Sequence, residues 1–393
     1  MLVRGSLETT GGGLQVLSRA FFYKPEWREA LKDAGIVALT TSEKTDQGLQ
    51  VAIDTTNKAF EKALFTVNNT VKKTDDLIYD NRVVSSILGS SHDQKFKLTR
   101  IQMSFRGEGV DWTIEDVIKD WKEKGSKPII LFVPGLLTDE TVWKENWTPY
   151  KRKRIRTKGI STELEKLGFH GIFVRFNHGL PIHENGKKLS EIFEIFQEHL
   201  PDSNPHIISY SLGGLVLRSA LFYGNQQNAE WPKKVQKVVM ISSPNRGSYL
   251  EKIGFWLGMI LEKSPNLFLK VLGIIGNLRS DAIKDLSFGL IRKEPKSFFT
   301  PISRYFQDPY HGELDEVDAY EAYSLLDDAK NPIQNFLGDG IVEKQSLSYL
   351  SNRVFAAKPR PDLRTLEIVK ANHFSILKRK ELFSWLDQIF RES

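Results

Sequence analysis

The sequence predicts an α/β fold, in which a mostly parallel sheet is covered by helices on both faces. From about residue 105 onward, short runs rich in β-branched and aromatic residues alternate with segments of helical periodicity. That alternation is typical of parallel strands joined by crossover helices. The chain has 393 residues, of which 40% are hydrophobic and 26% charged, a composition typical of a globular protein that buries at least one large core.

Strands are expected where short apolar runs end at turn residues. The run 129–133 ends at Pro134-Gly135, and the run 206–209 leads directly into an apolar helix. The other strands are expected at 96–105, 170–176, 235–241 and 366–369.

Helices are expected between these strands. Thr162 and Glu165 have the spacing of a capping box, which predicts a helix over 162–167. The other helices are expected at 189–200, 212–223 and 380–390. In the first of these, four apolar residues are expected to face the core: Ile192, Phe193, Ile195 and Phe196.

Residues 1–95 are expected to form a helical extension, and residues 96–393 the main domain. Within 50–89, apolar residues recur at spacings of three, four and seven and give one apolar helix face. These residues are Ile53, Phe60, Leu64, Val67, Val71 and Ile78. The glycines at 11–13 and the polar run 40–47 indicate loops, so the extension must pack on another part of the chain.

The formal net charge is +6, and six of the eight residues 151–158 are basic. Such a cluster attracts anionic lipid or nucleic acid, although charge runs are more often solvated loops. No aromatic residue interleaves with it, so we expect no nucleic-acid partner. Nothing in the sequence indicates the oligomeric state.

The chain contains no cysteine, which excludes disulfides and thiolate metal sites and favours a reducing compartment. Residues 1–19 lack the apolar run of a secretory signal, so a cytoplasmic location is expected. The most apolar region, 253–278, is interrupted by charged and polar residues and by Pro265, and is no clean transmembrane span. It is a candidate for peripheral contact with a membrane.

Ser211 stands where the strand 206–209 turns into a helix. In a nucleophile elbow the residues two positions before and after the serine must be small, and Ser209 and Gly213 satisfy this. Glycine is more usual at the first of these positions. The alternative is that Ser211 only caps the helix.

A serine hydroxyl becomes a nucleophile only when a base removes its proton. His373 follows the strand 366–369 and is the only one of the eight histidines that comes after the candidate acid. That acid is Asp339, in a Gly-Asp-Gly turn; Asp327 and Asp328 are its rivals. An Asp-Gly pair is also an ordinary turn signal.

An oxyanion needs backbone N–H donors that are fixed in advance. The loop after strand 129–133 and the residue after the serine are suitable, which makes Leu136 and Leu212 the expected donors.

These motifs resemble those of α/β-hydrolase lipases and esterases, which carry an oxyanion loop, a serine elbow, an Asp-Gly turn and a late histidine in that order. The resemblance covers residues 96–393 and implies the α/β-hydrolase fold with Ser211, Asp339 and His373 as catalytic triad. Similar lipases also carry a run like Ser243-Pro244-Asn245-Arg246-Gly247-Ser248. The run 280–286 is similar to one in GPI-inositol-deacylase-like and lecithin-acyltransferase-like branches.

The same resemblance implies a helical lid insertion at about 248–305. The expected substrate contacts are Leu137, Tyr210, Phe255 and Trp256. The apolar segment 253–278 would line an acyl pocket or meet a lipid surface, or it forms ordinary helices that cover the core.

The function expected from these residues is hydrolysis of carboxylic esters of lipid-like or acyl substrates through an acyl-enzyme. The alternatives are an acyltransferase with the same triad and a non-catalytic α/β-hydrolase scaffold. No phosphate-binding glycine loop and no cluster with metal-ligand spacing is present in the sequence, so no cofactor or metal is expected.

Overall fold

The computed structural model describes residues 101–107, 109–136, 138–144, 159–248, 281–294, 308–327 and 332–391. All of them belong to one compact unit of the chain, Tyr79–Ile260 with Arg279–Ser393. Three expectations fall outside the described residues: the helical extension 1–95, the basic cluster 151–158 and the apolar segment 253–278.

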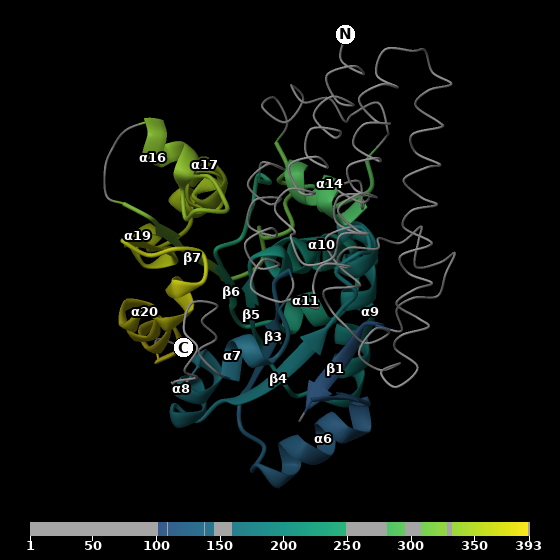
Figure 1. Cartoon of the computed structure of the whole chain (residues 1–393). Helices are drawn as coiled ribbons and strands as arrows, with labels where there is room; N and C mark the ends of the chain where they lie inside the picture. Colours follow the sequence, from purple (N-terminus) through teal and green to yellow (C-terminus); the bar gives the residue numbers. More distant parts are fainter. Residues whose placement is uncertain are drawn as a thin grey trace, which may run out of the picture. The chain divides into compact units, whose positions relative to one another are not determined.

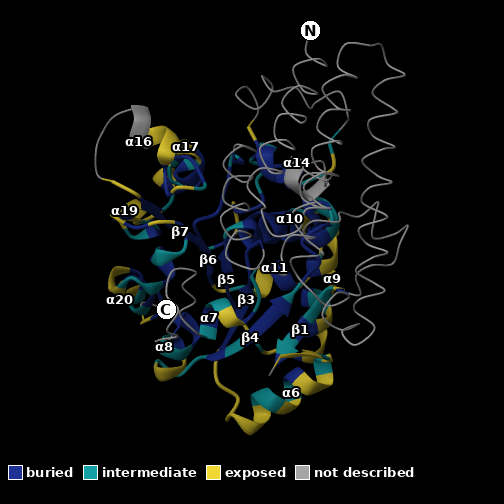
Figure 2. Cartoon of the chain, in the orientation of Figure 1, coloured by how far each residue is buried: buried dark blue, intermediate teal, exposed yellow. Residues whose placement is uncertain are grey.

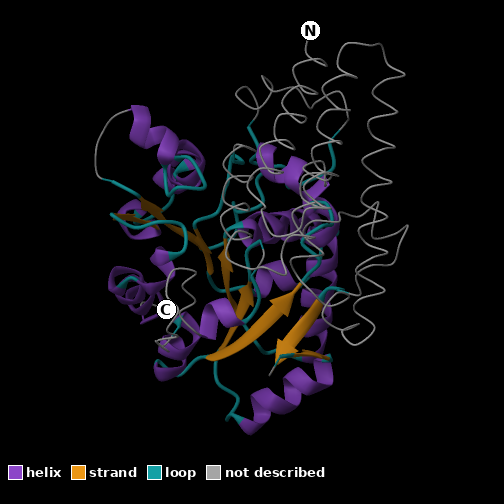
Figure 3. Cartoon of the chain, viewed as in Figure 1, coloured by secondary structure: helices purple, strands orange, loops and turns teal. Residues whose placement is uncertain are grey.

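The described part of the chain is organised around one sheet, whose strands are orange in Figure 3. The sheet has eight strands in the order β2-β1-β4-β3-β5-β6-β7-β8. The strands are β1 (Ser104–Gly107), β2 (Val110–Trp112), β3 (Ile129–Val133), β4 (His170–Arg175), β5 (His206–Tyr210), β6 (Val238–Ile241), β7 (Ala319–Leu325) and β8 (Thr365–Val369). From β4 to β8 in this order all neighbours pair in parallel, and β1 pairs antiparallel with both β2 and β4.

The central strands are buried along their whole length. Every residue of β3, β5, β6 and β7 is buried, which requires apolar side chains on both faces. The continuous apolar runs IILFV of β3 and VVMI of β6 meet this requirement. Strands β3 and β6 are therefore continuous apolar runs rather than alternating ones.

Helices cover both faces of the sheet (Figure 1). On one face α9 packs against α10, and α10 contacts β3 and β5; on the other, α8 contacts β4 and α20 contacts β8. The helices are α6 (Ile114–Glu123), α7 (Thr141–Lys144), α8 (Ile160–Lys166), α9 (Ile182–His199), α10 (Leu212–Gln226), α11 (Trp231–Lys234), α14 (Asp281–Phe288), α16 (Pro332–Leu337), α17 (Lys344–Leu347), α18 (Tyr349–Arg353), α19 (Pro361–Arg364) and α20 (Lys380–Arg391), with 3₁₀ turns η3 (Phe355–Ala357) and η4 (Ser375–Lys378).

The core lies between the sheet and these helices, and Figure 2 shows the central strands β3, β5 and β6 in the buried colour. On the face covered by α7, α8 and α20, one cluster joins alternate strand residues such as Ile130 and Phe132 to Trp143 of α7 and Leu386 of α20. Within the described ranges, no helix combines the length and apolar character needed to cross a bilayer.

Two expectations about individual elements are corrected. Helix α8 begins at Ile160 after an N-cap at Gly159, so Thr162 lies inside the helix and caps nothing. Ile195 of α9 is 42% exposed, because α9 presents Phe193 and Phe196 to the core instead.

The strand expected over 96–105 is described only from residue 101 and spans Ser104–Gly107. Two strands were missed: β2, which has three residues, and β7, whose apolar pattern is broken by a buried glutamate. Neither has the apolar run by which the other strands were found.

The carboxyl ends of the parallel strands gather the loops after β3, β5, β6, β7 and β8 at one edge of the sheet, where open α/β sheets bind ligands. The chain thus has the α/β-hydrolase fold predicted from its sequence, with the helix α10 starting directly after β5.

Candidate active site

Ser211 occupies a strained turn between β5 and α10. Its backbone has φ 53° and ψ −124°, a conformation that non-glycine residues rarely adopt. Backbone strain of this kind is found mainly at functional sites. Although Ser211 stands at the N-cap position, its side chain makes no capping hydrogen bond. The hydroxyl of Ser211 is therefore directed to another partner than its own helix.

Two glycines allow other loops to approach this turn. A Cβ atom on Gly213 would clash with the carbonyl oxygen of Pro134 and lie 2.6 Å from that of Val133. A Cβ atom on Gly214 would clash with the Ser243 side chain. The first turn of α10 thus fits between the ends of β3 and β6 only without side chains at these positions.

His373 lies on the loop after β8 and points its imidazole at Ser211. Its Nε2 atom is 2.9 Å from the Oγ of Ser211, and the ring is buried. Tyr210 helps to hold the histidine in place, because its hydroxyl donates to the backbone carbonyl of His373 at 2.9 Å. The two rings are in contact, with centroids 5.2 Å apart.

Asp339 lies on the loop after β7 and α16 and binds the other side of the imidazole. Its Oδ2 is 2.6 Å from Nδ1 of His373, and its Oδ1 accepts the backbone N–H groups of Ile341 and Val342 at 3.0 and 2.8 Å. The backbone N–H of His373 also donates to the carbonyl of Asp339. These bonds hold a fully buried carboxylate that would otherwise be costly to desolvate.

The loop after β3 also approaches the serine closely. A Cβ atom on Gly135 would lie 2.9 Å from the Cβ of Ser211, so glycine is needed for this approach. The turn is closed by Thr138, whose backbone N–H and hydroxyl both donate to the carbonyl of Gly135. Leu136 follows Gly135 in this turn, and Leu212 is the first residue of α10, where N–H groups have no acceptor within the helix.

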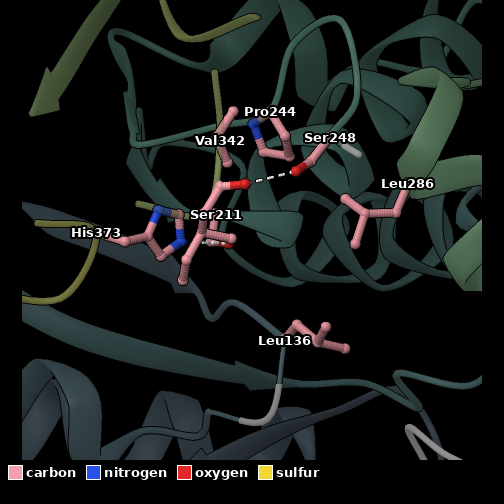
Figure 4. A pocket seen from close by; sticks show the side chains of 8 residues that line it. Leu136, Ser211, Pro244, Ser248, Leu286, Val342 and His373 are labelled. Carbon is pink, nitrogen blue, oxygen red and sulfur yellow. Dashed lines mark hydrogen bonds between the residues drawn. The ribbon is translucent and has the colours of Figure 1, made fainter. Parts of the chain in front are cut away.

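A small pocket opens at Ser211 and His373 (Figure 4). Apart from these two residues its lining is apolar with one serine: Leu136, Pro244, Ser248, Leu286, Ile341 and Val342. The hydroxyl of Ser248 donates to the carbonyl of Ile341 at 2.7 Å, which ties the loop after β6 to the loop of the acid. An apolar pocket of this kind favours apolar groups next to the serine.

Two other candidate residues, Tyr210 and Asp327, do not line the pocket, and four lie outside the described residues. The side chain of Tyr210 is buried under His373 and is not part of the pocket lining. Asp327, a rival for the acid, is exposed. Leu137, Phe255, Trp256 and Asp328 lie outside the described residues.

Sequence reasoning missed a buried polar network beneath the loop after β6. Arg218 of α10 pairs with Glu313 at 2.6 Å and donates to the carbonyl of Asn245. The side-chain amide of Asn245 lies 3.2 Å from the carboxyl of Glu321, which also accepts from the backbone N–H and the hydroxyl of Ser351. Burial raises the pKa of Glu321 to about 8. No sequence pattern signalled this network, because its members are far apart in the chain.

Among the described residues, no group of three or more histidine, aspartate or glutamate side chains is arranged to hold a metal ion.

Comparison with known proteins gives likenesses of fold. No family model matches the chain, and no curated protein matches it. Among solved structures, a mature lipase BlEst2 from Bacillus licheniformis is similar, with 19% identity, a TM-score of 0.42, and coverage of 67% of this chain and 92% of that one. A thermophilic esterase from Thermogutta terrifontis has 12% identity, a TM-score of 0.36, and coverage of 74% and 93%. A bacterial membrane phospholipase A has 14% identity, a TM-score of 0.36, and coverage of 68% and 79%.

Proposed function

We propose that this protein is a serine hydrolase that cleaves carboxylic esters with an apolar acyl part. The observation that carries the proposal is the continuous hydrogen-bond chain Ser211–His373–Asp339, with its serine on a strained strand-to-helix turn. This combination is the arrangement by which a serine hydroxyl is activated as a nucleophile.

In the proposed reaction, His373 Nε2 takes the proton of Ser211 as Oγ attacks the ester carbonyl carbon. The tetrahedral oxyanion is held by the backbone N–H groups of Leu136 and Leu212. The bond to the alkoxy oxygen then breaks, and the leaving alcohol takes the proton from Nε2. Asp339 keeps the imidazole in the tautomer that leaves Nε2 free to accept, and stabilises its cationic form.

In the second half of the reaction, His373 removes a proton from water, which attacks the acyl carbon. The oxyanion forms at the same site, and its collapse returns the proton to Ser211 and releases the carboxylic acid. The apolar lining around the serine supports an acyl substrate over a charged one.

The proposal is tested by labelling with a fluorophosphonate, which phosphonylates an activated serine. We expect wild-type protein to be labelled and Ser211→Ala not to be. A matched control is Ser126→Ala: Ser126 also has a left-handed φ of 52°, but it precedes β3 and so lies at the opposite edge of the sheet from Ser211. An unlabelled wild-type chain would leave the scaffold alternative standing.

Hydrolysis and acyl transfer are separated by product analysis. With a nitrophenyl ester and an added alcohol, hydrolysis gives free acid, and an acyltransferase gives the new ester. We expect free acid to predominate, and predominance of the new ester would reassign the reaction while keeping the same triad.

A further inference from the structure

The segment from α14 to Leu290 borders the pocket on the side away from the histidine. In Figure 4, Leu286 and His373 lie on opposite sides of Ser211. The Leu286 side chain is buried and lines the pocket together with Pro244 and Val342. It is therefore held against the site rather than standing in solvent.

The orientation that an ester must take at Ser211 determines which part of the substrate lies next to Leu286. His373 has to protonate the leaving alkoxy oxygen, so the alcohol part of the ester must face the imidazole. The acyl chain is attached to the other side of the carbonyl carbon and extends away from His373. In this structure that direction leads toward Leu286.

The backbone of the segment is fixed against the loop after β6. The N–H of Ser248 donates to the carbonyl of Leu286 at 3.2 Å. Gly247 and Gly289 have positive φ angles of 82° and 66°, and a Cβ atom on Gly289 would lie 2.6 Å from the backbone nitrogen of Gly247. Close packing of two glycine backbones leaves this part of the wall little freedom to move.

The residue before Leu286 provides a second attachment. The carboxylate of Asp285 accepts the N–H of Ile182 at 2.9 Å, at the first turn of the 18-residue helix α9. Helix α9 has Pro181 as its N-cap and no capping bond from its own side chains. A carboxylate from a segment 103 residues away thus satisfies a helix N–H and interacts favourably with the positive end of the helix dipole.

We propose that Leu286 determines the acyl-chain length of the substrate, and that Asp285 is a positioning residue that holds Leu286 in place by its bond to the start of α9. The proposal rests on the proposed ester hydrolysis at Ser211. It implies that the natural substrates are esters of short acyl chains, because the leucine side chain closes the space into which a longer chain would extend.

The test compares kcat/KM for nitrophenyl acetate and nitrophenyl octanoate in each variant. The ratio of the two values cancels general losses of activity. In Leu286→Ala we expect the octanoate-to-acetate ratio to rise roughly tenfold or more, the scale at which a hydrophobic pocket discriminates by a few carbon atoms. In Leu286→Phe the ratio should fall. Leu290→Ala is the matched control, because Leu290 is buried in the same segment but does not line the pocket.

The role of Asp285 is tested with two variants. Asp285→Ala removes the acceptor of the Ile182 N–H, and we expect the octanoate-to-acetate ratio to move several-fold in the same direction as in Leu286→Ala. Asp285→Asn keeps an oxygen that can accept this N–H and should restore the wild-type ratio. A residue with a merely structural role would change the melting temperature of both variants without changing the ratio.

The possible failures are distinguishable by fluorophosphonate labelling of the same preparations. A wild-type chain that is not labelled overturns the proposed function and this proposal with it. A labelled wild-type chain with an unchanged ester ratio in Leu286→Ala overturns the roles of Leu286 and Asp285 but leaves the proposed function standing. An unchanged ratio in Asp285→Ala, or a shifted one in Asp285→Asn, overturns only the role of Asp285.

Discussion

The hydroxyl of Tyr210 donates a hydrogen bond to the backbone carbonyl of His373 across 163 positions of the sequence. Tyr210 immediately precedes Ser211, so the two candidate catalytic side chains are connected through the backbone of the elbow as well as through their own contact at 2.9 Å. Burial raises the pKa of the Tyr210 phenol well above its usual value, which keeps it protonated as a donor.

Replacement of Tyr210 by phenylalanine should lower both stability and activity by modest amounts. The ring contact with His373 is kept, but the buried carbonyl of His373 loses its donor, which costs about 1–3 kcal/mol of unfolding free energy. We expect kcat/KM to fall by about tenfold, which corresponds to a loss of about 1.4 kcal/mol in stabilisation of the transition state. Urea denaturation and ester hydrolysis measure the two effects. Tyr223→Phe is the control, because the Tyr223 hydroxyl contacts the backbone of Lys293, which does not line the pocket. The activity of the Tyr223→Phe variant should equal that of the wild type.

Asp339→Asn should reduce kcat by about 10³ to 10⁴ while the fold is preserved. The amide oxygen can still accept the N–H groups of Ile341 and Val342, so the amide nitrogen must face Nδ1 of His373. That nitrogen donates and cannot accept, which forces the imidazole into the tautomer with a proton on Nε2. Steady-state kinetics with nitrophenyl butyrate measure the loss, with circular dichroism to check the fold. If Asp327→Asn caused the larger loss, the acid would have to be reassigned to the exposed rival.

Glu321 should make the protein less stable as pH rises. Its pKa is raised by burial to about 8 in the folded chain, against about 4.5 for an ordinary glutamate, so the folded state binds more protons between these values. The stabilising contribution is fully present below pH 4.5 and is lost as pH rises to about 8, with a slope of about 1.4 kcal/mol per pH unit. In Glu321→Gln this slope should disappear from urea denaturation measured across the window. An identical pH profile in the two proteins would mean that Glu321 is ionised in the fold at neutral pH.

His206 should make the protein less stable as pH falls, which is the opposite of the dependence expected from Glu321. Burial, with a further effect of Lys237, lowers its pKa from 6.5 to about 4, and its ring lies against those of Phe169 and Phe390. The unfolded chain therefore binds the proton first, so stability is kept above pH 6.5 and lost as pH falls towards 4. Subtraction of the stability curve of His206→Leu from that of the wild type should isolate this loss, because the carboxylates contribute equally to both. A flat difference curve would contradict the prediction.

Much of the fold could be predicted from the sequence because its central strands are buried on both faces. Strands β3 and β5 were found as continuous apolar runs, and helix α10 as the apolar segment that follows. Strand β7 escaped detection because Glu321 interrupts it, and the partners that make a buried glutamate acceptable, Ser351 and Asn245, come from other parts of the chain. The periodicity of apolar residues indicates which apolar side chains are buried. It does not indicate which buried polar groups find hydrogen-bond partners far away in the sequence.

The candidate site divides in the same way. Ser211, Asp339 and His373 were named because each stands in a local pattern with a chemical meaning, and the structure brings the three side chains into hydrogen-bond contact. Tyr210 was expected to contact substrate; its hydroxyl binds the backbone of His373 on the loop after β8, a partner that no local pattern could indicate. The bond between Asp285 and Ile182 had no local signal, because the two residues are more than one hundred positions apart in the sequence.

The glycines at 213 and 214 have an evolutionary consequence. Gly213 is enclosed by the loop after β3, which leads to an expected oxyanion donor, and Gly214 by the loop after β6, which carries the pocket residue Pro244. A methyl group at either position would therefore displace a loop that forms part of the site. A single substitution at either codon therefore meets an obstacle that only simultaneous changes elsewhere could remove. In a library of random variants selected for activity, both positions should be as invariant as the serine itself, although neither contributes a functional group.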